Sequence, residues 1–190
     1  MRNHQSLLKL FLIINVTAWL AACGGGGSSS DSEPGLYAIG DKGPAGGIVF
    51  YITEGGLHGL EAAPVDQSIT FTPWGCRGTL IAGADETAIG TGAQNTADIL
   101  AGCPDTPIAA DIAAGYTLNG FNDWFLPSKD ELRELYGNRW VVGGLSDAEK
   151  GYWSSSETNV DEAQGLIFHT GRHNSASKHI PARVRAVRAF

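Results

Sequence analysis

The stretch FNDWFLPSKDELRELYG, residues 121–137, carries the clearest secondary-structure signal in the chain. Ser128 is a favoured N-cap residue, and Glu131 follows at the third position, which is the spacing of a capping box. Acidic residues in the first turn suit the positive end of the helix dipole. Three side chains at the helical period form one apolar face: Leu132, Leu135 and Tyr136. These features predict an amphipathic helix that begins after Ser128 and ends at Gly137.

Upstream, the run IVFYIT at 48–53 predicts a buried strand, because its apolar residues alternate between two faces. Gly and Glu at 54–56 form a turn signal. A second strand is expected near 57–63, so the two strands form a hairpin.

Two helices are predicted between the hairpin and residue 121. The first lies within 87–103 and ends at Gly102, and its expected apolar face has helical spacing: Ala93, Ala97 and Leu100. For the second, Thr106 and Pro107 look like an N-cap and a first-turn proline, and the helix should end near Gly115.

The C-terminal third of the chain predicts strands. Segments 151–158 and 162–171 have strand-like composition, RHNSAS at 172–177 predicts a turn, and ARVRAVRAF at 182–190 alternates as a final strand. No internal repeat or second linker is present. The order of hairpin, helices and strands predicts one α+β domain over residues 36–190.

The N-terminus has the pattern of a targeting segment. Residues 1–22 combine Arg2 with an apolar run of about 14 residues, which is short for a membrane span. An uncleaved anchor is the alternative. The sequence Leu20-Ala21-Ala22-Cys23 resembles the bacterial lipoprotein lipobox, and this resemblance implies a signal peptide over 1–22 and lipid attachment at Cys23.

A linker follows the expected lipid anchor. Residues 23–35 are rich in Gly and Ser and have too little apolar surface to fold, so they predict a flexible tether. The residue after the lipid-bearing cysteine is Gly24 and not Asp, which would keep a lipoprotein in the inner membrane. By the usual lipoprotein sorting pattern, this residue implies that the protein is located in the bacterial outer membrane. The chain would then be held at the membrane by its N-terminal lipid, with exposure at the cell surface as one orientation.

Net charge and cysteine content bear on the protein's partners and on its redox compartment. The net charge is −7, and without residues 1–22 it becomes −9, which argues against a nucleic-acid partner. If Cys23 is acylated, Cys76 and Cys103 remain in an oxidising compartment, where a disulfide is expected. A metal site or a reactive pair is the alternative, although neither CxxC spacing nor flanking His accompanies them.

Five blocks in order resemble the C-terminal domain family of the Legionella collagen-like adhesin. They are GDKGPAGGIVFYI at 40–52, the run from Trp74 to Cys103, NGFNDWFLPSKDELRELY at 119–136, GYWSSSE at 151–157 and VRAVRAF at 184–190. The resemblance implies a C-type-lectin-like α+β fold on a secreted or surface-anchored protein. Adhesion to sulfated polysaccharides is known for the namesake. Collagen-type repeats are absent from this sequence, so a trimeric collagen stalk is not implied.

The sequence contains no motif of the common catalytic classes. G-x-S-x-G, the phosphate-binding loop and H-E-x-x-H are all missing, and so are EF-hand loops. The Glu-Pro-Asn and Gln-Pro-Asp triplets of sugar-binding C-type lectins are absent, and Asn122-Asp123-Trp124 is only superficially similar to their second motif. We therefore expect no cofactor, no metal and no enzymatic activity.

Basic residues concentrate at 165–190, a segment without Asp or Glu. Arginine binds sulfate and carboxylate with paired hydrogen bonds, so this segment is a candidate anionic-ligand site. The candidate ligand-binding residues are Arg172, His173, Asn174, Lys178 and His179. For the remaining arginines, pairing with the domain's own carboxylates is the favoured interpretation: Arg183, Arg185 and Arg188.

Histidine and tryptophan residues offer further possibilities. His169, His173 and His179 could suggest a metal, but Gly171 and the following polar residues interrupt any helix that would align them. Protonation below about pH 6.5 would instead add positive charge to the segment. Trp124 and Trp153 are expected in the core and not on a sugar-binding surface.

These features together predict a surface-tethered, non-catalytic, adhesin-like binding domain for an anionic glycan or another extracellular polymer. One alternative is a structural envelope lipoprotein that contacts peptidoglycan or a partner protein. Another is a hypervariable receptor of a diversity-generating element. The oligomeric state is not determined by the sequence.

Overall fold

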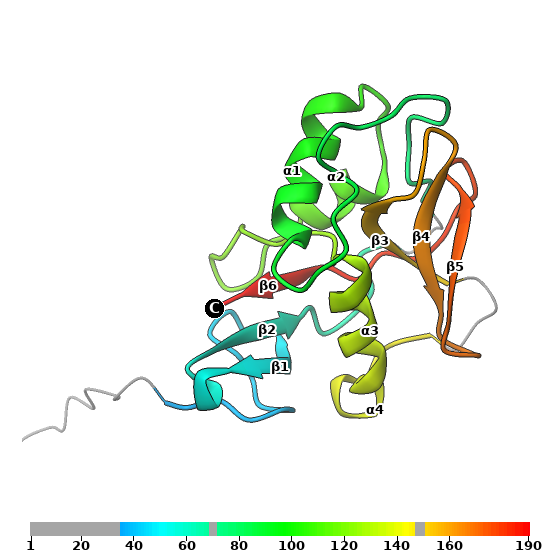
Figure 1. The fold of residues 1–190 in the computed structure, drawn as a ribbon. Helices are drawn as coiled ribbons and strands as arrows, with labels where there is room; N and C mark the ends of the chain where they lie inside the picture. The colour runs from blue at the N-terminus through cyan, green and yellow to red at the C-terminus, as the bar shows by residue number, and fades with distance from the viewer. Residues whose placement is uncertain (1–34, 69–71, 147–150) are drawn as a thin grey trace, which may run out of the picture. The chain divides into compact units, whose positions relative to one another are not determined.

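The first sheet combines the predicted hairpin with the C-terminal strand. The computed structural model describes residues 35–68, 72–146 and 151–190. Strand β1 (Ile48–Thr53) pairs antiparallel with β2 (His58–Ala62) across the short 3-10 helix η1 (Glu54–Gly56), which confirms the hairpin. Strand β6 (Val187–Ala189) pairs antiparallel with β2, so the order is β1-β2-β6 (Figure 1).

The second sheet contains three consecutive antiparallel strands. They are β3 (Tyr152–Glu157), β4 (Glu162–Ile167) and β5 (Arg172–Ser177), in the order β3-β4-β5. The turn predicted for RHNSAS is wrong, because these residues form β5, and the turn before it lies at 168–171. Strand β5 lies at the edge of its sheet, where the strand is open to solvent and polar residues are common. The same polar composition is typical of turns, so the two cannot be told apart from it.

The C-terminal segment connects the two sheets. Ala182 forms an isolated bridge with Thr72 and Arg183 forms one with Tyr152 at the start of β3, whereas only Val187–Ala189 belongs to a sheet. The predicted final strand is therefore shorter than expected. Its residues run from the second sheet back to the N-terminal hairpin, as the red trace in Figure 1 shows.

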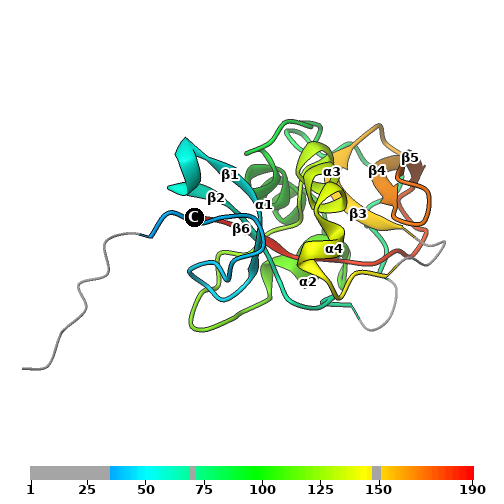
Figure 2. The same cartoon turned by 90° about the horizontal axis from the view of Figure 1, so that it is seen from below.

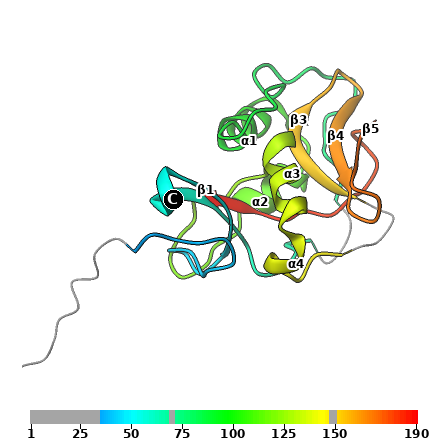
Figure 3. The same ribbon diagram turned by 60° about the horizontal axis from the view of Figure 1, so that its bottom comes forward.

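Helix α3 (Lys129–Gly137) has the boundaries and the cap that the sequence predicts. The Ser128 hydroxyl accepts a hydrogen bond from the Glu131 N–H (3.3 Å), and the Glu131 carboxylate accepts one from the Ser128 N–H (2.7 Å). Leu132 and Leu135 are fully buried in a cluster that also contains side chains of β1, β4 and β6. Helix α3 thus lies between the two sheets and joins their cores (Figures 2 and 3). The short helix α4 (Arg139–Val142) follows it and was not predicted.

Helix α1 (Gly92–Gly102) exists where predicted, but it buries a different face. The expected apolar positions Ala93, Ala97 and Leu100 are exposed. The buried side combines Ile99 with the polar residues Asn95 and Thr96, and the Asn95 amide donates to the Ser155 hydroxyl of β3 (3.3 Å). Helix α1 therefore turns polar residues toward the buried serines of β3, and this orientation cannot be predicted from the spacing of its apolar residues.

Helix α2 (Ala109–Ala114) begins later than predicted. Its N-cap is Ile108, in extended conformation, and not Thr106. The Asp111 carboxylate accepts the Ile108 N–H (3.0 Å) and so replaces the expected threonine cap. The predicted end is confirmed, because Gly115 is the C-cap.

The mixed α+β class is confirmed by two small antiparallel sheets and four helices in the described part of the chain. Residues 35–190 belong to one compact unit. The predicted signal peptide and Cys23 lie outside the described residues, and so does nearly all of the linker. Where the structure describes the chain, no helix is both long and apolar enough to cross a membrane.

Candidate functional site

Strand β5 places Arg172 and Asn174 on the face of the second sheet that is turned away from α3. Residues two apart in a strand share a face, and Leu166 of the opposite face packs with α3. Asn174 is paired with Gly165 of β4, which is paired in turn with Trp153 of β3. A row of indole, glycine and amide therefore crosses the sheet.

A hollow of about 180 Å³ lies over this row. Its walls are mostly apolar and include Ile167 of β4 and the segment Ile180–Ala182. Position 165 takes glycine because a Cβ there would lie 2.9 Å from the Tyr152 carbonyl oxygen, which is too close for a side chain. The Asn174 amide makes no hydrogen bond to any described residue, so its donors and acceptor are available to a ligand.

Arg172 does not line this hollow, but it is paired with a residue that does. Its cross-strand partner is Ile167, which lines the hollow, and the Arg172 residue is exposed. In the described part of the chain Arg172 forms no ion pair, in contrast to the arginines that follow it. The arrangement offers one positive charge beside an apolar surface with an amide, which is suited to an anionic sugar.

His173 points to the opposite face and does not join Arg172 and Asn174. Both of its ring nitrogens are enclosed without a hydrogen-bond partner. Desolvation lowers the pKa of His173, and the positive charges of Arg133 and Lys129 on α3 lower it further, while Asp130 opposes them. His173 therefore binds a proton at lower pH than an ordinary histidine, and its ring does not share a face with Arg172 and Asn174.

Lys178 is buried and is not a surface ligand-binding residue, which corrects the prediction. Its ammonium group is fully enclosed, forms an ion pair with Glu157 and donates to the Thr79 carbonyl oxygen (2.7 Å). It also lies 4.8 Å from the centre of the Trp74 ring. These contacts stabilise the Lys178 charge within the domain, because a buried ammonium group without partners would be costly.

The three arginines near the C-terminus pair with carboxylates of the domain, as favoured from the sequence. Arg183 and Arg185 both pair with Asp66, at 3.4 Å and 2.7 Å. Arg188 pairs with Glu61 at 3.0 Å. The favoured interpretation of these residues is confirmed.

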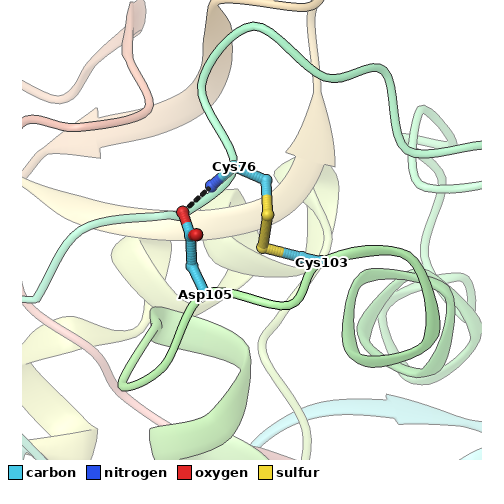
Figure 4. Close-up of side chains that lie close together, drawn as sticks. All are labelled: Cys76, Cys103 and Asp105. Carbon is cyan, nitrogen blue, oxygen red and sulfur yellow. Dashed lines mark hydrogen bonds between the residues drawn. A yellow bond between two sulfur atoms is a disulfide. The ribbon is translucent and has the colours of Figure 1, made fainter.

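The predicted disulfide between Cys76 and Cys103 is present (Figure 4). The Asp105 carboxylate lies beside it and accepts the Cys76 N–H (2.8 Å). These three residues are the one group of possible metal ligands found in the described part. Because both sulfurs are bonded to each other, neither is a thiolate, and a single carboxylate remains, so the group does not fit a metal site.

His179 lies at a second, larger hollow of about 550 Å³ beside the disulfide. Arg77 and Asp105 also line it, but Arg77 pairs with Asp161 (3.2 Å) and the His179 ring is hydrogen-bonded to the Ser177 hydroxyl (2.7 Å). The five predicted ligand-binding residues thus divide among different surroundings. Arg172 and Asn174 are the two that the structure brings together.

Tryptophan exposure separates core residues from a surface residue that the sequence analysis missed. Trp124 and Trp153 are each 2% exposed, which confirms their core positions. Trp140, on α4, is 74% exposed. The signal available in the sequence was its location after Gly137, beyond the end of the periodic apolar pattern.

Comparison with models of known protein families and with curated proteins found no match to this chain. Its function must therefore be inferred from the chemistry of these surfaces.

Proposed function

We propose that this chain is a lipid-anchored, non-catalytic, adhesin-like protein whose domain binds an anionic polysaccharide. The observation that carries the proposal is the exposed Arg172, whose cross-strand partner Ile167 lines an apolar hollow together with Asn174. The guanidinium group would bind a carboxylate or sulfate, and the amide would bind a sugar hydroxyl.

The fold proposed for the domain is C-type-lectin-like, related to the C-terminal domain family of the Legionella collagen-like adhesin. Two features support it. The C-terminal strand β6 closes the N-terminal hairpin, and the helices and the second antiparallel sheet lie between these segments in the sequence. The second feature is the set of five sequence blocks that resemble the family.

A local positive charge matters because the chain as a whole is acidic, with a net charge of −7. An anionic polymer is repelled by such a protein at long range, and it needs an unpaired cation at the point of contact. Arg172 meets that requirement, whereas the buried cations Arg185 and Lys178 are each paired with a carboxylate of the domain.

The anchor belongs to the same proposal. Acylation of Cys23 would place the domain at the outer membrane, and the Gly/Ser-rich segment 23–35 would separate it from the lipid surface. Mass spectrometry of the protein from its native host should show a lipid-modified Cys23, and Cys23→Ser should release the protein into the aqueous fraction. An unmodified thiol at position 23 would exclude the anchor.

Binding can be tested with the full-length protein in detergent, using immobilised dextran sulfate and uncharged dextran. We expect binding to dextran sulfate alone, and weaker binding at high salt because screening reduces charge attraction. Arg172→Ala should weaken it by about tenfold, corresponding to about 1.4 kcal/mol for a charge-assisted contact. Arg77→Ala is the matched control, since Arg77 is also exposed but already pairs with Asp161.

Equal binding by the Arg172 and Arg77 variants would remove Arg172 from the site. Turnover of a glycan substrate by the wild-type protein would contradict the non-catalytic part of the proposal. Cleavage of the domain by protease added to intact cells is expected if the domain faces outward, and full protection would contradict that orientation.

A further inference from the structure

Trp140 is the most exposed of the large apolar side chains in the described residues, at 74%. Burial of an aromatic side chain is a main source of folding energy, and an indole left in water contributes little to it. The other tryptophans that the structure describes are at most 2% exposed: Trp74, Trp124 and Trp153. The exposed indole of Trp140 is therefore available for contact with another molecule.

Arg139 is held beside this indole. Its guanidinium carbon lies 4.1 Å from the centre of the Tyr136 ring and 4.8 Å from the centre of the Trp140 ring. One N–H group donates to the Tyr136 carbonyl oxygen (2.9 Å). Within the described part of the chain no carboxylate pairs with Arg139, and its other N–H donors make no hydrogen bond. A cation with free donors is thus fixed next to an aromatic face.

A small hollow of about 130 Å³ adjoins the pair. It is lined by Arg139, Trp140, Gly143, Gly144 and Leu145. The two glycines have φ of 67° and 62°, a conformation that residues with a Cβ adopt at a cost. A Cβ at Gly144 would also lie 2.6 Å from the Pro64 carbonyl oxygen, so this loop requires glycine there.

The loop under the hollow is held from the protein interior. The fully buried Arg185 donates to the carbonyl oxygens of Gly143 and Gly144, and its charge is balanced by Asp66. Asp66 also accepts a hydrogen bond from the Tyr152 hydroxyl (3.0 Å). This network fixes the backbone beside Trp140, so a ligand would meet a preorganised surface and lose less entropy on binding.

We propose that Arg139 and Trp140 form a second ligand site, which takes a pyranose ring that carries a carboxylate. The C–H groups of one sugar face would stack on the indole, whose electron-rich face attracts weakly positive hydrogens, and the carboxylate would pair with the guanidinium fork. This inference rests on the proposed glycan-binding function and extends it to uronic acids. None of the residues that line this hollow lines the one beside Asn174.

A lipid surface is a weaker fit to the same residues. Interfacial binding needs a wide apolar face, whereas α4 exposes only Trp140 and Val141 as large apolar side chains, at 74% and 53%. The fixed guanidinium and the adjoining hollow instead suit a compact anionic group.

The test uses full-length protein in detergent and a hexamer of galacturonic acid, with maltohexaose as the uncharged control. Addition of the hexamer should change the emission of Trp140, measured as the difference between wild type and Trp140→Phe. We expect Trp140→Ala to weaken binding by about threefold to tenfold, the usual range for an aromatic contact. Arg139→Ala should weaken it at least as much and reduce its salt dependence, because the charge contribution is lost.

The matched control is Leu80→Ala, which removes another exposed apolar side chain (64% exposed). It should bind like wild type, and all variants should keep the wild-type circular dichroism spectrum. If wild type binds the hexamer and Arg172→Ala weakens it while Trp140→Ala does not, this inference fails and the proposed function stands. If wild type binds neither the hexamer nor dextran sulfate, the proposed function fails as well. A Trp140 emission shift on transfer to phosphatidylglycerol vesicles, with none on hexamer addition, would assign the surface to membrane contact and overturn the inference.

Discussion

The buried ion pair between Lys178 and Glu157 gives the sharpest test of the domain's energetics. Side-chain exposure is 0% for Lys178 and 1% for Glu157, so both charges have lost their hydration. Lys178→Met keeps the length of the side chain but leaves the Glu157 carboxylate buried without its cation. The Ile81 N–H still donates to that carboxylate (3.1 Å), but a neutral donor cannot replace a charge.

The expected loss of stability is about 3 to 5 kcal/mol, the usual cost of breaking a buried pair by removing one partner. A domain of this size has a total stability of about 5 to 15 kcal/mol, so the effect is large. The double variant Lys178→Met/Glu157→Gln should recover most of the loss, because no charge remains buried and the glutamine oxygen can still accept the Ile81 N–H.

Urea unfolding monitored by tryptophan fluorescence measures both variants, since Trp74 lies beside the ammonium group. The reasoning would be refuted if Lys178→Met lost less than about 1 kcal/mol, or if the double variant were as unstable as the sum of the two single variants. A surface role for Lys178 predicts the opposite result, namely weaker glycan binding with unchanged stability.

Three further predictions concern other parts of the fold. Replacing Cys76 and Cys103 with Ser should lower the free energy of unfolding by about 3.6 kcal/mol in the chain-entropy model, for a sequence separation of 27, and a urea midpoint equal to wild type would contradict it. Burial lowers the pKa of His173, so the folded state binds this proton less well than the unfolded state, and the free energy of unfolding should fall as the pH drops below about 6.5. His173→Phe should reduce this fall between about pH 7.5 and 5.5, and identical pH profiles for the variant and wild type would contradict the prediction. Ser128→Ala should cost about 1 kcal/mol of thermal stability through loss of the α3 cap, whereas an unchanged melting temperature would show that the cap is dispensable.

Local signals in the sequence predicted the elements whose determinants lie within a few residues of one another. The cap and the apolar face of α3 depend on contacts three or four residues apart, and the β1–β2 hairpin depends on a short turn. The disulfide followed from the number of cysteines and their expected compartment. Each of these predictions is confirmed.

The errors arose where distant segments decide the environment. Helix α1 buries Asn95 because it faces the serines of β3, about 60 residues away in the chain, and not because of its own apolar pattern. Residues 172–177 form a strand because β4 offers a pairing edge. Lys178 looked like a surface cation until the fold placed Glu157 beside it.

In the candidate site, too, some features follow from local sequence and others from contacts between distant segments. Residue type made Arg172 and Asn174 candidate ligand-binding residues, and strand register then placed Asn174 in line with Gly165 and Trp153. The location of Trp140 after Gly137 was only a weak signal, because the exposure of a side chain is a property of the folded surface.

Short-range sterics and hydrogen bonding specify the α+β composition, the capped helix and the hairpin, so the sequence was sufficient to predict them. The cysteine pairing could also be predicted, because only two cysteines remain once Cys23 is assigned to the lipid. Tertiary structure alone decided which charges are neutralised and which remain free. Arg185 and Arg172 are the same residue type in the same basic segment, yet one is buried against Asp66 and the other is exposed beside a hollow. The physical reason is that the energy of a charge depends on the groups around it, and for this chain those groups come from segments far apart in sequence.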